Sequence, residues 1–590
     1  GTLGLGGEDL IASAAEGITL GSTSSSMMSV GSITATNGAG DVSIYNNGSL
    51  TVNGITNDGF VGVYALSYGG GTNPSITVAG NINSGTGDIY IEAEGSITQN
   101  DGTTISSNDG DIAIEADVES DGFGSITQIG SATISSDSGD IWVFIDSGLS
   151  TGQNISITNI NASITGEVIL ATTGGEIIDN DTTDDNDITA HYLFIMATEG
   201  IGRTNSIETT VTYLDVYNDG IGDVNISNTG TLALMSSPYV PDGLSVYSGG
   251  GDVNISTAST ILIADPIETN GGDLSLTATT GISQNAYIFT GDGGSGAGDY
   301  TADAGTGVYT MTSTSWIDTT DTGGDGDVSI TAGDDITITD INAGIGTVSL
   351  TSGASILDDN DDTTYITAGT INLTAAVDIG STDGQSGIRP GFIDIDPTNL
   401  GSGTITLTGA AGSNIYLNFE GDFESGFLAE PGGVSPNNGT TSINSLTIGA
   451  DNITINSDIF NVDDDGNSGG IYYDLYLLAN SGLTLTNDIV TNENILELAT
   501  GGDLTLTMAN ITFNNPDGTL ILWADFDNSG TGSITGGTSG SPINLTNVEN
   551  LILIAAEGIN IYTVADPINI AAYNSTSGEI NIDNVGDITV

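Results

Sequence analysis

A five-residue phrase, Gly-Asp-(Val/Ile/Leu)-x-(Ile/Leu/Val), recurs along this 590-residue chain. It begins at Gly40, Gly87, Gly110, Gly139, Gly222, Gly251, Gly326 and Gly502, and variants with Glu or Thr in second place begin at Gly166, Gly346, Gly403 and Gly578. In each copy a turn glycine precedes apolar residues at alternate positions, which is the period of a strand with one buried face. Each copy therefore predicts one short β-strand.

The spacing of the phrase indicates how these strands are arranged. The most closely spaced neighbouring copies start 20 to 29 residues apart, as from Gly87 to Gly110 and from Gly110 to Gly139. Such self-similarity indicates a solenoid, in which each repeat buries its apolar face only by stacking on its neighbours. No stretch keeps the 3.6-residue period of a helix between capping residues. We therefore predict an all-β fold, a parallel β-helix (β-solenoid) with loop insertions.

Two segments depart from the repeat pattern. Residues 284–325 are rich in Gly, Asp and aromatic residues, and residues 420–442 contain the sequence EGDFESGFLAEPGGVSPNNG. A solenoid places such insertions outside the stack as loops. We therefore expect β-helix repeats over 1–283, 326–419 and 443–590, separated by an atypical Gly/Asp-rich insertion and a loop insertion.

The charge of the chain excludes two classes of partner. Two arginines, no lysine and one histidine accompany 76 acidic residues, so the formal net charge is −74. Nucleic acid binding needs several basic side chains on phosphates, and an anionic membrane surface repels so acidic a chain. Cysteine is absent, which excludes disulfides and thiolate metal sites. The abundant Ile, Val and Thr favour an ordered solenoid over a disordered acidic chain.

The ends of the sequence fall inside the repeat pattern. The chain starts at Gly1 without an initiator Met or a signal peptide and ends in the phrase GDITV. We therefore expect a segment of a larger protein. No apolar run reaches the 18 residues that a membrane helix needs, so we expect no membrane insertion.

Clusters of aspartate are the candidate metal sites. Carboxylate oxygens are the ligands that Ca²⁺ prefers, although neither DTGGDGD (Asp321–Asp327) nor DDDGN, which begins at Asp463, has the spacing of an EF-hand loop. The alternative interpretation is a set of solvated acidic turns. The predicted cofactor is Ca²⁺, and the candidate ligands are Asp179, Asp181, Asp184, Asp185, Asp358, Asp359, Asp361, Asp362, Asp463, Asp464 and Asp465.

Two longer stretches resemble a known family. The sequences TAGDDITITDINAGIGTVSLTSGASILDD (Thr331–Asp359) and ATEGIGRTNSIETTVTYLDV (Ala197–Val216) are similar to the repeats of filamentous-haemagglutinin-like exoproteins. Those are large bacterial surface proteins, many of them exported by two-partner secretion. The resemblance implies a right-handed parallel β-helix and a location outside the cell, on the bacterial surface.

The function that we expect is structural. The chain is predicted to form the shaft of a bacterial surface adhesin or a subunit of a self-assembling extracellular fibre, acidic and cation-binding. Its expected partners are further copies of itself, in filaments, and a surface polysaccharide or a cell-surface receptor.

The alternative is a carbohydrate-binding or carbohydrate-cleaving β-helix similar to tailspikes and lyases. Lyases of this shape use basic residues, and Arg203 and Arg389 are far apart in the sequence. A glycoside hydrolase needs only two carboxylates, and among 76 acidic residues a suitable pair arises by chance. We therefore predict no enzymatic activity. A cleft lined by aromatic residues would favour the carbohydrate-binding alternative.

Overall fold

The structure is a computed structural model of the whole chain. By their internal contacts the residues divide into unit 1, Gly1–Asp303 with Asp321–Gly323, and unit 2, Ala304–Thr320 with Gly324–Val590. The residues that the structure describes are 9–22, 26–67, 72–119, 122–145, 151–181, 183, 186–237, 243–294, 296–359, 365–381, 391–400, 405–409, 414–419, 422–424, 445–455, 474–486, 489–491, 495–507, 510–513, 518–526, 529–565 and 568–590.

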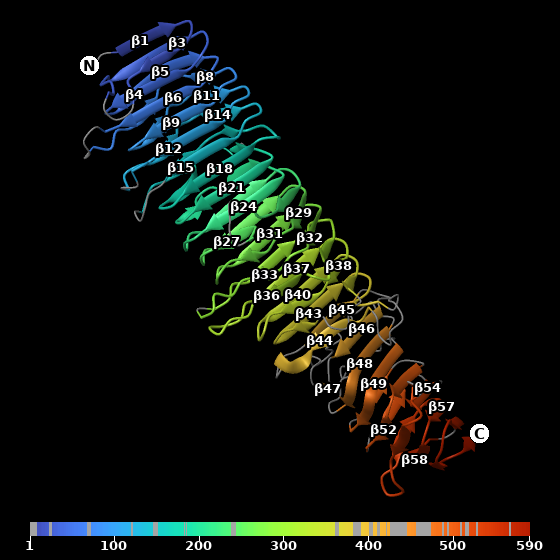
Figure 1. Cartoon of the computed structure of the whole chain (residues 1–590). Helices are drawn as coiled ribbons and strands as arrows, with labels where there is room; N and C mark the ends of the chain where they lie inside the picture. Colours follow the sequence, from blue (N-terminus) through green and yellow to red (C-terminus); the bar gives the residue numbers. More distant parts are fainter. Residues whose placement is uncertain are drawn as a thin grey trace. The chain divides into compact units, whose positions relative to one another are not determined.

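Unit 1 is a stack of coils whose strands form two parallel ladders (Figure 1). The first ladder contains β1 (Asp9–Ala14), β3 (Ser32–Asn37), β5 (Leu50–Asn57), β7 (Ile76–Val78), β8 (Ile82–Ser84), β10 (Ile97–Gln99), β11 (Thr104–Ser107), β13 (Ile126–Gln128), β14 (Thr133–Ser136), β16 (Ile155–Ile157), β17 (Ile160–Asn161), β19 (Glu176–Asp179), β20 (Ile188–Thr189), β22 (Gly200–Ile201), β23 (Ile207–Thr210), β25 (Val224–Asn228), β28 (Val253–Thr257), β31 (Leu274–Ala278) and β34 (Tyr300–Asp303).

The second ladder of unit 1 lies in the same coils. It contains β2 (Ile18–Leu20), β4 (Val42–Asn47), β6 (Val61–Leu66), β9 (Ile89–Ala93), β12 (Ile112–Ala116), β15 (Ile141–Ile145), β18 (Glu167–Thr172), β21 (Tyr192–Ala197), β24 (Tyr213–Asn218), β26 (Leu232–Leu234), β27 (Val246–Ser248), β29 (Thr260–Ile263), β30 (Ile267–Glu268), β32 (Gly281–Gln284) and β33 (Ile288–Phe289).

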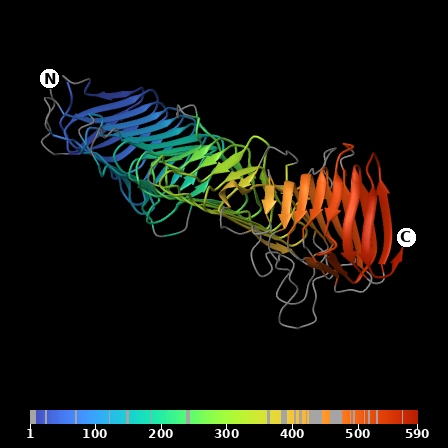
Figure 2. The same cartoon turned by 90° about the horizontal axis from the view of Figure 1, so that it is seen from below.

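Unit 2 is built in the same way, and Figure 2 shows its orange and red strands side by side. Its strands are β35 (Tyr309–Met311), β36 (Trp316–Asp318), β37 (Val328–Ala332), β38 (Ile336–Ile338), β39 (Asp340–Asn342), β40 (Thr347–Ser352), β41 (Ile356–Asp358), β42 (Ile366–Thr367), β43 (Thr370–Ala375), β44 (Ile393–Asp396), β45 (Ile405–Gly409), β46 (Asn414–Phe419), β47 (Asp422–Glu424), β48 (Ser445–Ile455), β49 (Asp474–Leu485), β50 (Ile489–Thr491), β51 (Ile495–Thr500), β52 (Asp503–Leu506), β53 (Ile511–Phe513), β54 (Gly518–Ala524), β55 (Ser533–Gly536), β56 (Ile543–Thr546), β57 (Val548–Ala555), β58 (Gly558–Val564), β59 (Ile568–Asn574), β60 (Ile580–Val585) and β61 (Ile588–Thr589). A 3₁₀ turn at Pro397–Asn399 is the one helical element of the described residues.

The predicted β-solenoid is confirmed. The phrases starting at Gly87, Gly110 and Gly139 become β9, β12 and β15, which pair in parallel and in register, with Ile112 opposite both Ile89 and Ile141. Inward Ile, Val and Leu residues stack in columns and are almost fully buried. Each such side chain contributes about 1.5–3 kcal/mol when it leaves water. The right-handed sense of the coil stays a prediction.

The glycine of the phrase lies where successive coils approach each other closely. A Cβ atom on Gly110 would lie 2.4 Å from the carbonyl oxygen of Gly87, and one on Gly139 would lie 2.3 Å from that of Gly110. No side chain fits at that distance. A serine three residues earlier completes the corner, since Ser107 Oγ donates to the Gly87 carbonyl and accepts from the Gly110 amide.

The aspartate of the phrase links each coil to the next. The carboxylate of Asp88 accepts the backbone N–H of Asp111 at 3.0 Å, that of Asp111 accepts the N–H of Asp140 at 2.9 Å, and that of Asp140 accepts the N–H of Glu167 at 2.8 Å. Hydrogen bonds to charged groups stabilise by about 1.5–3 kcal/mol each. The recurrent aspartate is therefore a structural element of the coil corner.

The two predicted insertions have different outcomes. Residues 284–325 do not form an insertion, because they contain β33 to β36 and place Tyr300 and Tyr309 fully inside the stack. Of residues 420–442, the structure describes Asp422–Glu424 alone, which form β47 and pair with β48. The rest of that predicted loop lies outside the described residues.

Candidate functional site

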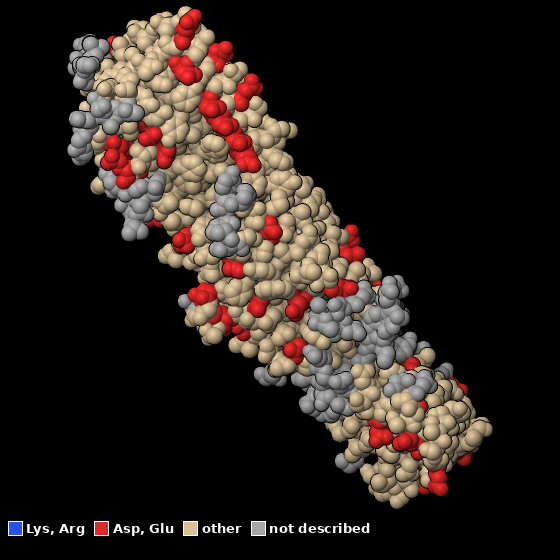
Figure 3. Space-filling view, in the orientation of Figure 1, with Lys and Arg blue, Asp and Glu red and all other residues tan. Residues whose placement is uncertain are grey.

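Acidic side chains are distributed over much of the surface, and Figure 3 shows them in short rows on the face that it displays. Many of them have structural partners, as in the aspartates of the repeat phrase. Asp321, from the calcium-like sequence DTGGDGD, likewise accepts the backbone N–H groups of Asp292, Gly293 and Gly294, each at 3.1 Å. Surface acidity alone therefore identifies no metal site.

Three carboxylates come together in one place among the described residues. Asp179 ends β19, Asp187 precedes β20, and Glu208 lies in β23 of the following coil. One carboxylate oxygen from each residue lies within 4.8 Å of the other two. We call these three residues the carboxylate cluster. Asp179 is among the ligands predicted from the sequence, whereas Asp187 and Glu208 are not.

Hydrogen bonds hold the carboxylate cluster in position. One carboxylate oxygen of Asp187, Oδ2, accepts the backbone N–H of Glu208 at 3.0 Å, and Asp179 Oδ1 accepts the N–H of Asp181 at 2.9 Å. The side-chain amide of Asn205 donates to Asp179 Oδ2. Asp187 is fully buried, and its second oxygen, Oδ1, accepts no hydrogen bond. The cluster therefore contains a buried carboxylate oxygen that lacks a donor.

The position of Asp187 disfavours the ionised form of its carboxyl group. Burial, together with the negative charges of Asp179 and Glu208, raises the pKa of Asp187 to about 9. The guanidinium of Arg203 forms an ion pair at 2.5 Å with Glu176, which does not belong to the cluster. Two buried carboxylates and a third, half-buried one need a proton or a cation to compensate for lost hydration.

The other predicted metal ligands are placed as follows. Asp181 accepts the backbone N–H and the hydroxyl of Thr183, which closes a local turn. Asp358 ends β41 with its side chain buried, Asp359 follows it, and neither belongs to a three-carboxylate group among the described residues. Asp184, Asp185, Asp361, Asp362, Asp463, Asp464 and Asp465 lie outside the described residues.

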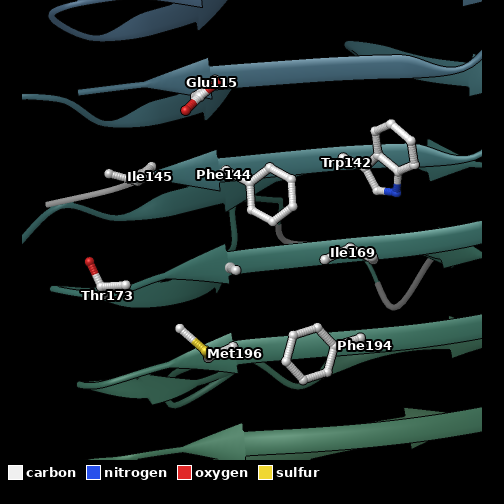
Figure 4. A pocket seen from close by; sticks show the side chains of 9 residues that line it. Glu115, Trp142, Phe144, Ile145, Ile169, Thr173, Phe194 and Met196 are labelled. Atoms are coloured by element: carbon white, nitrogen blue, oxygen red, sulfur yellow. The ribbon is translucent and has the colours of Figure 1, made fainter. Parts of the chain in front are cut away.

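A second candidate site is an apolar hollow of about 490 Å³ on the outer face of the second ladder of unit 1. Figure 4 shows the side chains that line it, which come from β12, β15, β18 and β21 or directly follow these strands. They are Glu115, Trp142, Phe144, Ile145, Ile169, Ala171, Thr173, Phe194 and Met196. We call it the aromatic hollow.

The strand register explains why the surface is hollowed there. Ala171 lies between Phe144 on one side and Met196 on the other, in a column of outward-facing residues. A small residue between two large ones leaves space above its own strand. In the neighbouring column Trp142, Ile169 and Phe194 are in register, and they form an apolar wall beside that space.

Aromatic residues continue beyond the hollow on the same outer face. Tyr45 and Tyr64 stack with ring centroids 4.3 Å apart, and Tyr64 and Tyr90 are tilted at 5.6 Å. The hydroxyl of Tyr90 donates to Glu115 at 2.7 Å, at the edge of the hollow. Burial first, and the neighbouring Tyr45 next, raise the pKa of Tyr64 to about 12. Tyr64 is therefore neutral at physiological pH.

Comparisons with known proteins assign no family to the chain. No family model, no curated protein and no solved structure matches it. The resemblance to filamentous-haemagglutinin-like exoproteins therefore stays a prediction. Among the described residues no helix is long and apolar enough to cross a membrane.

Proposed function

We propose that this chain is a structural protein of the bacterial cell surface, either the shaft of an adhesin or a subunit of an extracellular fibre. The observation that carries the proposal is the repetition of one corner device. A glycine contact, an aspartate–amide hydrogen bond and inward Ile or Val residues join coil after coil. Repeating the same corner in successive coils builds a long, stiff stack and does not build a single reaction centre.

The composition supports a role outside the cell. The backbone hydrogen bonds of the ladders stabilise the coils without cysteine. With a net charge of −74, the carboxylates of the folded chain repel one another, so the fold needs counterions. We expect NaCl to raise the melting temperature by screening, because surface charges more than about 10 Å apart interact weakly at 0.1 M salt.

The self-association that we propose uses the edges of the parallel ladders. A strand at such an edge presents backbone N–H and C=O groups with which a strand of another copy pairs. A head-to-tail contact that does not close produces a filament.

Electron microscopy tests this proposal. The purified chain, observed by negative stain at increasing protein concentration and with or without a divalent-ion chelator, should form end-to-end filaments. Chelation should loosen side-by-side bundles and leave single filaments intact. Immunogold labelling of the source cells should place the chain on surface structures. Single chains under every condition, together with no surface label, would contradict the proposal.

A second candidate function, carbohydrate binding, is favoured by the aromatic hollow. The ring faces of Trp142, Phe144 and Phe194 offer apolar surface on which sugar rings stack, and Glu115 supplies a hydrogen-bond acceptor at the rim. The hollow carries no basic residue, so a neutral glycan suits it better than a polyuronate.

The hollow allows a matched pair of variants. Titration of neutral oligosaccharides, followed by tryptophan fluorescence, should show saturable binding that Ala171→Phe abolishes by filling the space. Phe123→Ala removes an exposed aromatic residue that does not line the hollow and should leave binding unchanged. Equal affinities in the two variants would show that any sugar binds elsewhere.

A further inference from the structure

We propose that the carboxylate cluster, Asp179, Asp187 and Glu208, binds one Ca²⁺ ion that joins two adjacent coils of unit 1. This site is separate from the structural function proposed above and does not depend on filament formation. It also differs from the general counterion atmosphere of an acidic surface, because it requires three named side chains in a fixed geometry.

The first argument is geometric. Ca²⁺ takes oxygen ligands at about 2.3–2.6 Å. Two ligands on opposite sides of the ion are therefore separated by at most about 5 Å. The three carboxylate oxygens of the cluster lie within 4.8 Å of one another. One ion between them could contact all three with little movement, since Asp187 and Glu208 are neighbours across the register of β20 and β23.

The second argument is the buried oxygen of Asp187. Asp187 is fully buried, its Oδ2 atom is occupied by the Glu208 N–H, and its Oδ1 atom accepts no hydrogen bond. A buried acceptor without a donor costs about 1–3 kcal/mol, and more when it is charged. A cation at this position supplies the missing contact. This observation is independent of the number of acidic residues nearby.

The third argument is charge balance. The one ion pair found among the described residues joins Arg203 to Glu176, neither of which belongs to the cluster. When all three carboxylates are ionised they carry three negative charges, and a divalent ion neutralises two of them. The all-oxygen donor set favours Ca²⁺ over Zn²⁺, and the irregular geometry of two coils favours Ca²⁺ over Mg²⁺, which demands a near-ideal octahedron.

The test compares two single-carboxylate variants of the full chain. Isothermal titration with CaCl₂ and with MgCl₂, at constant ionic strength and at a protein concentration where the chain is monodisperse, measures saturable binding. The wild-type chain should show a tight calcium component that Asp187→Asn weakens by about 100-fold or more, since a lost ligand costs at least as much as a lost supporting contact. Asp109→Asn removes an exposed carboxylate outside the cluster and should leave that component unchanged.

Thermal unfolding gives an independent readout, because the order of the melting temperatures of wild type and variant should differ between chelator and calcium. In chelator, Asp187→Asn should melt at the same temperature as wild type or higher, because the amide retains an oxygen for the Glu208 N–H and cannot ionise beside Asp179 and Glu208. In excess calcium the wild type should melt higher, through binding to the folded state. Glu208→Gln provides a second variant if Asp187→Asn fails to fold.

Two results would overturn the proposal. Equal calcium responses in wild type, Asp187→Asn and Glu208→Gln would mean that calcium acts by screening or at another place. A wild-type chain with no saturable calcium component would mean that a proton, shared among the carboxylates, balances the cluster. Filament formation in the electron microscope is unaffected by either result, so the two proposals fail separately.

Discussion

Two acidic segments of the chain have nearly the same sequence and different surroundings. The first, EIIDNDTTDDNDITA, starts at Glu176 in unit 1, and the second, SILDDNDDTTYITA, starts at Ser355 in unit 2. Each begins with a strand that ends in a buried aspartate, Asp179 in β19 and Asp358 in β41, and each leads into a strand beginning Ile-Thr.

The residue before Ile-Thr decides what each segment can do. In unit 1 it is Asp187, which lies opposite Glu208 of the next coil. In unit 2 it is Tyr365, which precedes Ile366 and so lies opposite Asp394. The first pairing completes a three-carboxylate group, whereas the second replaces one carboxylate by a phenol. Both segments are acidic. A three-carboxylate group forms only where the residue before Ile-Thr and the residue opposite it in the next coil are both acidic.

The largest effect on stability should come from the buried isoleucine that the two segments share. Ile188 and Ile366 are fully buried inward residues that follow the two variable positions. Truncation to Ala should lower the free energy of unfolding by about 2–5 kcal/mol at each position. Urea unfolding of both variants measures this loss. A loss confined to one variant would show that the two segments do not belong to equivalent coils.

A pH experiment concerns Asp215, a buried acid of unit 1 that does not belong to the carboxylate cluster. Burial raises the pKa of Asp215 to about 6, above its ordinary value of 3.8, against hydrogen bonds from Ser237 and Tyr192 that lower it. The folded state therefore holds this proton more tightly than the unfolded state. The contribution of Asp215 to the free energy of unfolding is fully present below pH 3.8 and is lost as the pH rises through 6, a change of about 3 kcal/mol.

Asp215→Asn should remove that part of the pH dependence. Unfolding midpoints measured between pH 4 and 7 should fall less with rising pH in the variant than in the wild type. Its calcium response should equal that of the wild type, because Asp215 does not belong to the cluster. An unchanged slope in the variant would show that another group titrates in this range.

A substitution in unit 2 can introduce the carboxylate that its acidic segment lacks. Tyr365→Asp places a carboxylate opposite Asp394 and should lower stability in chelator by about 1–3 kcal/mol, because it crowds buried acids. Calcium should restore most of this loss, and titration should show a second saturable component. If the variant gains no calcium response, the geometry of unit 1 provides more than the three carboxylates.

The smallest effect should come from the ion pair beside the first segment. Arg203 and Glu176 are both partly exposed, so Arg203→Gln should lower stability by about 1 kcal/mol or less. Because Arg203 is paired with Glu176, the variant should bind calcium with nearly the wild-type affinity. A large gain in affinity would mean that the guanidinium compensates the cluster.

Much of the fold follows from local patterns. The phrase GDIAI at Gly110 predicts the start of β12 and its inward residues Ile112 and Ile114, because alternation and a turn glycine act within a few residues. The prediction failed at 284–325, where the inward positions carry Tyr300 and Tyr309 rather than aliphatic residues. The size of the side chain that a coil accepts depends on neighbouring coils, which local pattern does not reveal.

The candidate sites follow from the sequence only in part. Asp179 was found because it starts a conspicuous run of acids. Glu208 was missed because it stands alone in its strand, and only the 21-residue offset from Asp187, one coil period, connects the two. The aromatic hollow has no local signal either, since its shape depends on Ala171 lying between Phe144 and Met196 from different coils.

By itself, the sequence determined the class of fold, the strand positions, the inward faces and the acidic character of this protein. These properties depend on residues close together in the chain. The tertiary structure alone decided which acids meet, which serve the coil corner and where the surface is hollow. Those outcomes depend on register between coils, and a shift of one residue would move Glu208 away from Asp187 to the opposite face of its strand.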